Sequence, residues 1–274
     1  MTPSPDAASA PRVALEWHDQ VQLGGALFPE GVQLMVEREA RLPLYHSDSP
    51  LLAPAHLSFK LHAEATPAFV PRAGPAIEFE PIAFFDCGAR LYGTFWLGAF
   101  SAMIPADSAD FAGTRQERRA LIAAGERDAG WSLRADLHAR LKAKVWRVIA
   151  LAELEGRHHH AETASGPFDY WWEPSEMLTI ASDAWVIDKK AWLFGELIRA
   201  ETEADRKLWI GGVAMDVSAP STGDHSLRVG AVALIKPTAA PAMPLFIVGA
   251  MPWVTSRFAE PLPPYVVIAA QWNR

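Results

Sequence analysis

The sequence predicts an α+β fold, in which mixed or antiparallel β-sheets enclose a central helical segment. Three observations support this: alternating apolar and polar residues before position 100, helical apolar spacing in the middle, and proline-broken apolar runs near the end. Strands followed by helices and further strands around one core are typical of α+β proteins. At 274 residues the chain can bury a sizeable core.

The first part of the chain, residues 12 to 100, is expected to be rich in strands. In AHLSFKLHAE, residues 55–64, the alternate apolar side chains must face one side of a strand. The segments 76–85 and 89–100 are predicted as further strands, separated by a turn around Asp86 and Gly88. The apolar set in the first segment is Leu57, Phe59, Leu61 and Ala63.

The middle of the chain shows helical spacing. One helix is predicted for 114–124, and another from Ser132, a suitable N-cap, to about Glu155, where Gly156 would end it. Its tail, VWRVIALAELE, is equally compatible with a strand. The apolar stripe of the second helix consists of Leu133, Leu137, Leu141, Val145 and Val148.

A third helix is predicted for 189–207, with Asp188 as its cap. After it the sequence returns to strand patterns, at 207–217, 226–235, 244–251 and 265–272. Prolines between these runs suit loops and sheet edges.

The chain is expected to form a disordered lead, residues 1–12, and a single globular domain, residues 13–274. HAEATP at 62–67 resembles HAETASGP at 160–167, and the similarity continues with small gaps. A decayed duplication would divide the domain into related halves, 13–112 and 113–274. Chance similarity in a sequence rich in Trp and Ala is the alternative.

Composition narrows the class of protein. The net charge of −7 argues against a nucleic-acid partner. The single cysteine, Cys87, excludes an intramolecular disulfide and fits a reducing compartment. The sequence contains neither a run of about 20 apolar residues nor a secretory signal at its start. We therefore expect a soluble, cytoplasmic protein with no membrane contact, and a homo-oligomer is compatible with this expectation.

Aromatic residues are the compositional anomaly, because the chain contains 11 tryptophans. Exposed Trp and Tyr side chains are typical of ligand pockets and partner interfaces. The segment FDYWWEP is therefore predicted to bind a protein or small-molecule ligand, with core packing as the alternative. Its candidate binding residues are Phe168, Tyr170, Trp171 and Trp172.

Three consecutive histidines precede this segment. If the chain is extended there, His158, His160 and Glu162 share one face and could ligate a divalent metal such as Zn²⁺ or Fe²⁺. A solvated loop is the alternative. Two functions follow: a binding or interaction protein that uses the aromatic segment, or a metal-dependent hydrolase with Asp169 as base. The sequence leaves open whether the protein is an enzyme.

Overall fold

The computed structural model describes most of the chain, in segments separated by short gaps. These segments are 14–27, 30–45, 47–65, 71–97, 103–106, 108–109, 111, 115–125, 128–173, 178–198, 208–220, 226–236, 243–255 and 265–273. The predicted lead, 1–12, lies outside the described residues.

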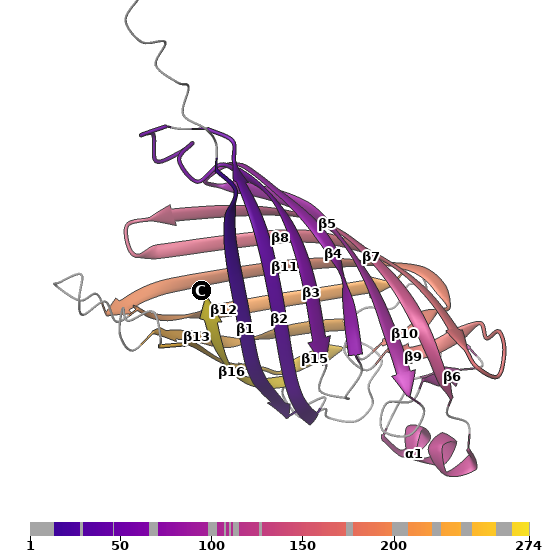
Figure 1. Ribbon diagram of the computed structural model, residues 1–274. Helices are drawn as coiled ribbons and strands as arrows, with labels where there is room; N and C mark the ends of the chain where they lie inside the picture. The colour runs from indigo at the N-terminus through magenta and orange to yellow at the C-terminus, as the bar shows by residue number, and fades with distance from the viewer. Residues whose placement is uncertain are drawn as a thin grey trace, which may run out of the picture.

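Twelve antiparallel strands of the described chain close into a β-barrel (Figure 1). Each strand pairs with its neighbours along the chain, and β1 pairs with β16 to close the ring. The strands are β1 (Glu16–Leu27), β2 (Glu30–Pro43), β3 (His56–Ala65), β4 (Pro71–Ile82), β5 (Phe85–Leu97), β7 (Ala129–Val145), β8 (Val148–Thr163), β11 (Asp183–Ile198), β12 (Leu208–Pro220), β13 (Ser226–Lys236), β14 (Leu245–Met251) and β16 (Tyr265–Asn273).

The two ends of the barrel differ. At one end, which we call the turn end, β4–β5 and β7–β8 are joined by the tight turns 83–84 and 146–147. At the other, the mouth end, the connections after β5 and β8 hold a separate three-stranded sheet. This mouth sheet consists of β6 (Ile104–Ala106), β9 (Tyr170–Glu173) and β10 (Leu178–Ala181).

The remaining elements are small. Helix α1 (Arg115–Ala124) lies beside the mouth end and agrees with the helix predicted for 114–124 (Figure 1). The short strand β15 (Trp253–Thr255) pairs with β13. In the described part of the chain, no helix is both long and apolar enough to cross a membrane.

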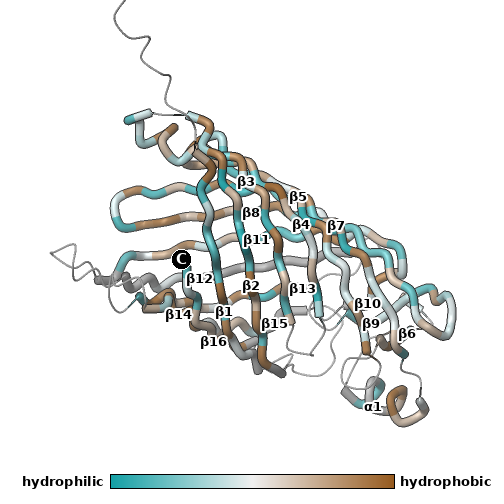
Figure 2. Tube along the Cα trace, viewed as in Figure 1, coloured by the Kyte–Doolittle hydropathy of each residue, from teal (hydrophilic) through white to brown (hydrophobic). Residues whose placement is uncertain are grey.

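Hydrophilic and hydrophobic residues alternate along many of the strands (Figure 2). The large hydrophobic side chains of the barrel strands are exposed on the outer face, whereas many of the polar side chains that alternate with them are buried towards the lumen. On β3, Phe59 and Leu61 are 53% and 67% exposed, whereas Ser58 is fully buried. The predicted alternation in 55–64 is therefore confirmed. Its apolar residues face outward, however, and its polar residues line the interior.

Exposed aromatic residues on the described strands and turns form a band near each end of the barrel, and leucine and valine occupy the surface between the bands. Near the turn end are Trp17, Tyr45, Phe59, Phe79, Phe84 and Trp146; near the mouth end are Phe95, Trp131 and Trp185. An apolar belt between two aromatic bands is typical of the surface of transmembrane barrels.

The predicted helix from Ser132 to Glu155 is wrong, because this stretch forms β7 and the first half of β8. Leu133, Leu137, Leu141 and Val145 recur every four residues. Four is also a multiple of the two-residue strand period, so in β7 they all face outward. The open alternative, a strand for 145–155, agrees with the hairpin of β7 and β8 around Trp146 and Arg147.

The third predicted helix is also wrong over its described part, since β11 continues to Ile198. The late strands agree with β12, β13, β14 and β16. A closed barrel therefore replaces the predicted α+β fold with its central helical segment. The prediction of two related halves, 13–112 and 113–274, stays a prediction.

The expectation of a soluble, cytoplasmic protein without membrane contact is contradicted by the outer surface. A large exposed apolar belt is unfavourable in water and matches the interior of a bilayer. A barrel of this kind needs no run of about 20 apolar residues, because a membrane strand has only about 9–11 residues and only alternate ones must be apolar.

Candidate functional site: the charged lumen and its mouth

Ion pairs connect neighbouring strands along one wall of the lumen. Lys60 on β3 lies between two carboxylates: its Nζ is 3.3 Å from Glu37 Oε1 on β2 and 2.8 Å from Glu78 Oε2 on β4. The Nη2 of Arg90 on β5 is 3.0 Å from the other oxygen of Glu78. These four side chains therefore bridge four consecutive strands.

The ion pairs continue across β7, β8 and β11. Arg140 Nη2 is 2.7 Å from Glu153 Oε2, and Lys190 Nζ is 3.2 Å from Glu153 Oε1 and 2.5 Å from Glu155 Oε2. Nearer the turn end, Lys142 Nζ lies 2.8 Å from Glu80 and 2.7 Å from Asp86. The charges on this wall are thus mutually compensated, which makes their burial tolerable.

The most deeply buried pair joins Arg157 on β8 to Asp188 on β11. Both residues are almost completely buried, at 2% and 1% exposure, and the Arg157 Nη2 atom contacts Asp188 Oδ2. Asp188, which sequence analysis treated as a helix cap, is therefore a lumen residue. Its pairing could not be read from the sequence because the register of β8 and β11 decides it.

Near the mouth end, the lumen side of β1, β14 and β16 instead carries small or apolar residues, among them Gly24, Gly249 and Ala269. A Cβ added to Gly24 would lie 3.0 Å from Ala269 Cβ, and one added to Gly249 would lie 3.2 Å from Val267 Cγ1. The side chains on this part of the wall are short and project little into the lumen. At the turn end, a hollow of about 290 Å³ is lined by polar residues that include His18, Gln20 and Glu39.

The predicted aromatic segment forms the centre of the mouth sheet. Trp171 is fully buried and meets Trp96 of β5 edge to face, with ring centroids 5.4 Å apart. Trp172, 3% exposed, packs against Phe111 at 6.4 Å. Phe168 packs against the cluster around Trp171, and Tyr170 pairs with Ala106 in the sheet register.

This packing places the mouth sheet against the inside of the barrel. Trp171 shares its cluster with inward-facing barrel residues, and Ile180 and Met103 of the mouth end belong to the same cluster. The barrel residues involved are Trp96, Ala161 and Val186. The mouth sheet therefore narrows the mouth end of the lumen. This packing contradicts the prediction of a soluble protein that binds its partner through an exposed aromatic surface. A ligand contact by Phe168, Tyr170, Trp171 or Trp172 stays a prediction.

The predicted metal residues share the outer face of β8 at the mouth end. His158 Nε2 is 2.9 Å from Asp183 Oδ1, and His160 Nδ1 is 3.2 Å from Asp183 Oδ2. His160 Nε2 is 3.3 Å from Glu162 Oε1. Sequence analysis missed Asp183, which lies opposite His160 in the register of β11 and β8.

These side chains lie at the level of the aromatic band, where Trp131 contacts His160 and Trp185 contacts His158. Within the residues that the structure describes, no group of three or more His, Cys, Asp or Glu side chains is placed to hold a metal ion. Metal binding by His158, His160 and Glu162 stays a prediction, and a metal-dependent hydrolase has no support. The proposed base, Asp169, is exposed and offers its backbone oxygen to Ser182 N at 2.9 Å.

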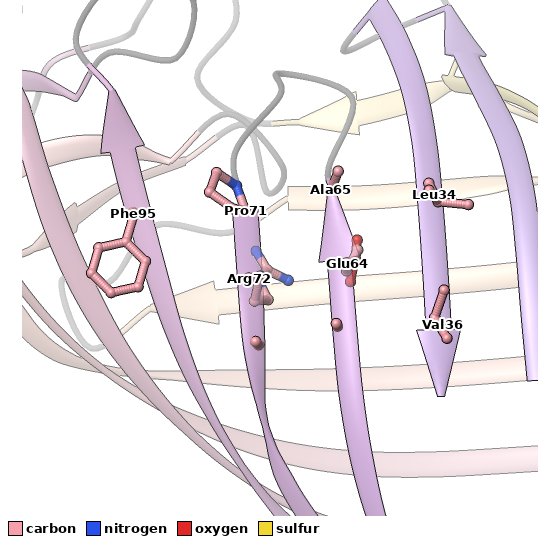
Figure 3. A pocket seen from close by; sticks show the side chains of 9 residues that line it. Leu34, Val36, Glu64, Ala65, Pro71, Arg72 and Phe95 are labelled. Atoms are coloured by element: carbon pink, nitrogen blue, oxygen red, sulfur yellow. The ribbon is translucent and has the colours of Figure 1, made fainter. Parts of the chain in front are cut away.

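An apolar hollow of about 360 Å³ lies on the barrel wall near the mouth end (Figure 3). The hollow forms where the small side chains of Ala63, Ala65 and Ala73 lie beside larger ones, such as those of Leu34 and Phe95. Figure 3 also shows Glu64 and Arg72 on the neighbouring strands β3 and β4. Both residues occupy lumen-facing positions in these strands, because they alternate with the outward-facing Ala63 and Ala73.

Comparisons with known proteins give only distant likenesses. No family model matches the chain, and no curated protein matches it. Among solved structures, LpxR from Salmonella typhimurium matches with a TM-score of 0.39 and 9% identity, over 93% of this chain and 99% of that chain. Outer-membrane expressed OmpT of Vibrio cholerae gives 0.38 and 7%, over 95% and 97%. The translocator domain of autotransporter NalP from Neisseria meningitidis gives 0.39 and 8%, over 94% and 86%. The strand registers therefore define the fold, and the positions of the side chains are the basis for the functional proposal.

Proposed function

We propose that the protein spans a bacterial outer membrane as a twelve-stranded barrel and that its charged lumen passes small hydrophilic solutes. One observation carries this proposal: the polarity of the barrel is the reverse of that of a soluble barrel. Leu61, Leu137 and other apolar side chains face outward, while Lys60, Asp136 and Arg157 face the lumen. Only a bilayer makes the exposed apolar belt favourable.

The connections of the barrel support an orientation. Outer-membrane barrels have an even number of antiparallel strands, short turns on the periplasmic side and longer loops on the outer side. The long connections that hold the mouth sheet and α1 lie at the mouth end, whereas the turn end has the two-residue turns 83–84 and 146–147, which supports an orientation with the turn end in the periplasm. The mouth sheet and α1 then lie on the outer side, where they control access to the lumen.

The lining of the lumen favours polar solutes. Charges of opposite sign pair between neighbouring strands, across β2, β3, β4 and β5 and again across β7 and β8, so no single sign dominates the wall. An apolar solute gains nothing on such a surface, whereas a hydrated polar solute can replace its water contacts there. The small residues on the opposite wall, such as Gly24 and Gly249, leave space beside the charged wall.

Conductance across a planar lipid bilayer tests this function. The reconstituted protein is expected to give small conductance steps, because the mouth sheet narrows the lumen. Trp171→Ala should increase the conductance severalfold, since removing a fully buried indole costs about 3–5 kcal/mol of local packing. The barrel strands carry their own pairing and should stay closed.

Trp185→Ala is the matched control, because Trp185 is 45% exposed on the outer face of β11 and lies outside the mouth sheet. It should leave the conductance unchanged. Absence of conductance in both the wild-type protein and Trp171→Ala would contradict a solute pathway, and an equal increase for both variants would contradict the gating role of the mouth sheet.

A further inference from the structure

Two adjacent lysines of β11 point to opposite sides of the barrel wall. Lys190 faces the lumen, where it forms ion pairs with Glu153 and Glu155. Lys189 is exposed and faces outward, because neighbouring residues of a strand alternate between the two faces. Within the residues that the structure describes, the Lys189 ammonium has neither an ion pair nor a hydrogen bond. The charge of Lys190 is therefore compensated, and that of Lys189 is not.

The surroundings of Lys189 are apolar. In the strand registers it lies opposite Leu154 of β8, which in turn lies opposite Ala139 of β7. Leu154 and the next outward residue of β11, Ile187, are both exposed. Lys189 therefore places a charge inside the apolar belt. A lysine on the lipid face of a barrel is unfavourable there, so this position favours a partner of opposite charge.

The depth of Lys189 decides which partner can reach it. Trp185, in the aromatic band at the mouth end, precedes it by four residues on β11, about 13 Å along the strand and about 10 Å in depth. The band at the turn end is further away, because Glu196, seven residues beyond Lys189, donates its backbone N–H to Arg147 in the turn that holds Trp146. A lysine side chain that extends towards the nearer band carries its ammonium towards the lipid headgroups.

A second copy of the chain cannot supply the counter-ion. The exposed carboxylates that the described strands carry on the outer face are Asp19, Glu162 and Asp183, and each lies beside an aromatic band. Copies in one membrane hold these carboxylates at the same depths, so none of them meets Lys189 within the belt. The anion that the bilayer itself provides is the phosphate of a lipid headgroup.

We infer that Lys189 binds the phosphate of a lipid in the leaflet at the mouth end, and that the acyl chains of this lipid lie along the belt. The attraction between ammonium and phosphate is strong where little water is present. Trp185 lies at the level where an indole N–H can donate to the same lipid. The inference rests on the transmembrane placement in the proposed function, but not on the passage of solutes.

Native mass spectrometry of the detergent-solubilised full chain, titrated with dioleoylphosphatidylglycerol, tests the site. The comparison lipid is dioleoylglycerol, which has the same acyl chains and no phosphate. The wild-type protein should bind about one phosphatidylglycerol, about tenfold more tightly than dioleoylglycerol, and Lys189→Leu should remove this preference. Lys189→Arg should keep it, because the charge is kept. Equal binding of the two lipids by the wild-type protein, or an unchanged preference in Lys189→Leu, would overturn the site.

Arg38→Leu is the matched control. Arg38 is also an exposed cation on the outer face, but it has a counter-ion, since its Nε is 3.5 Å from Asp19 Oδ1. This variant should keep the preference for phosphatidylglycerol. Loss of the preference in both Arg38→Leu and Lys189→Leu would show general electrostatics and would overturn the site. A dimer of the wild-type protein that Lys189→Leu dissociates would assign Lys189 to a protein contact and would overturn it as well.

Folding into vesicles separates this inference from the membrane placement itself. Lys189→Leu should raise the urea midpoint of unfolding more in phosphatidylcholine vesicles than in vesicles that also contain phosphatidylglycerol, because the anionic lipid compensates the lysine of the wild-type protein. An equal rise in both would overturn the lipid site and leave the transmembrane placement. Failure of the wild-type protein to fold into either kind of vesicle would overturn the placement, and the site with it.

Discussion

Arg157→Leu is expected to destabilise the barrel by about 3–5 kcal/mol, because it leaves a buried carboxylate without its cation. Asp188 is only 1% exposed, and water cannot replace the lost guanidinium there. Urea unfolding of the protein in lipid vesicles, followed by tryptophan fluorescence, measures the change in the free energy of unfolding.

The double variant Arg157→Leu with Asp188→Leu identifies the cause. It should regain much of the loss, because an apolar pair of similar volume removes the unpaired charge. Asp19→Asn, in the exposed pair with Arg38, should change stability by less than about 1 kcal/mol. If the double variant is as unstable as the sum of the two single variants, the pair does not act as a unit and the expected mechanism is wrong.

The local conformation of the strands was largely predictable, but the side of the strand that faces the core was not. Period-two alternation in 55–64 gives the same pattern whether the apolar face packs in a core or faces lipid. The polar face held the missing signal. Lys60, His62 and Glu64 alternate with apolar residues on β3. Charged side chains that face water need no partners of opposite charge on the neighbouring strands, whereas these side chains face the lumen and have such partners.

The helical prediction for 132–155 failed for a different reason. Leucines spaced by four residues fit both a helix and a strand, and the residues between them decide the question. On β7 these are Ala135, Ala139 and Ala143, which keep the outer face apolar at every second position. An apolar residue at every second position over 17 residues is a strand pattern longer than soluble sheets usually need.

The functional residues depended on pairings that only the register reveals. His158 and His160 were correctly placed on one face of an extended segment, but Asp183 joins them from a strand that sequence spacing does not locate. The aromatic segment was found as a unit, yet Trp171 is buried because the mouth sheet folds against Trp96.

Leu137→Arg is expected to weaken insertion of the barrel into a bilayer by about 2–4 kcal/mol, the penalty for arginine on the lipid face at the membrane midplane. Leu137 is 55% exposed and lies on β7 about halfway between Trp131 and Trp146, the aromatic residues that mark the two edges of the belt. Folding of the purified, denatured chain into vesicles, titrated with urea, measures the penalty. Leu97→Arg is the matched control.

Leu97 is 60% exposed at the mouth end, beyond the aromatic band at Phe95, so arginine there reaches the headgroups and should cost only about 0–1 kcal/mol. The comparison depends on depth alone, since both changes replace an exposed leucine with the same charged residue. In water, neither exposed arginine would be penalised. Equal, near-zero effects of the two substitutions would therefore contradict the transmembrane placement, whereas a penalty confined to Leu137 requires a bilayer around the belt.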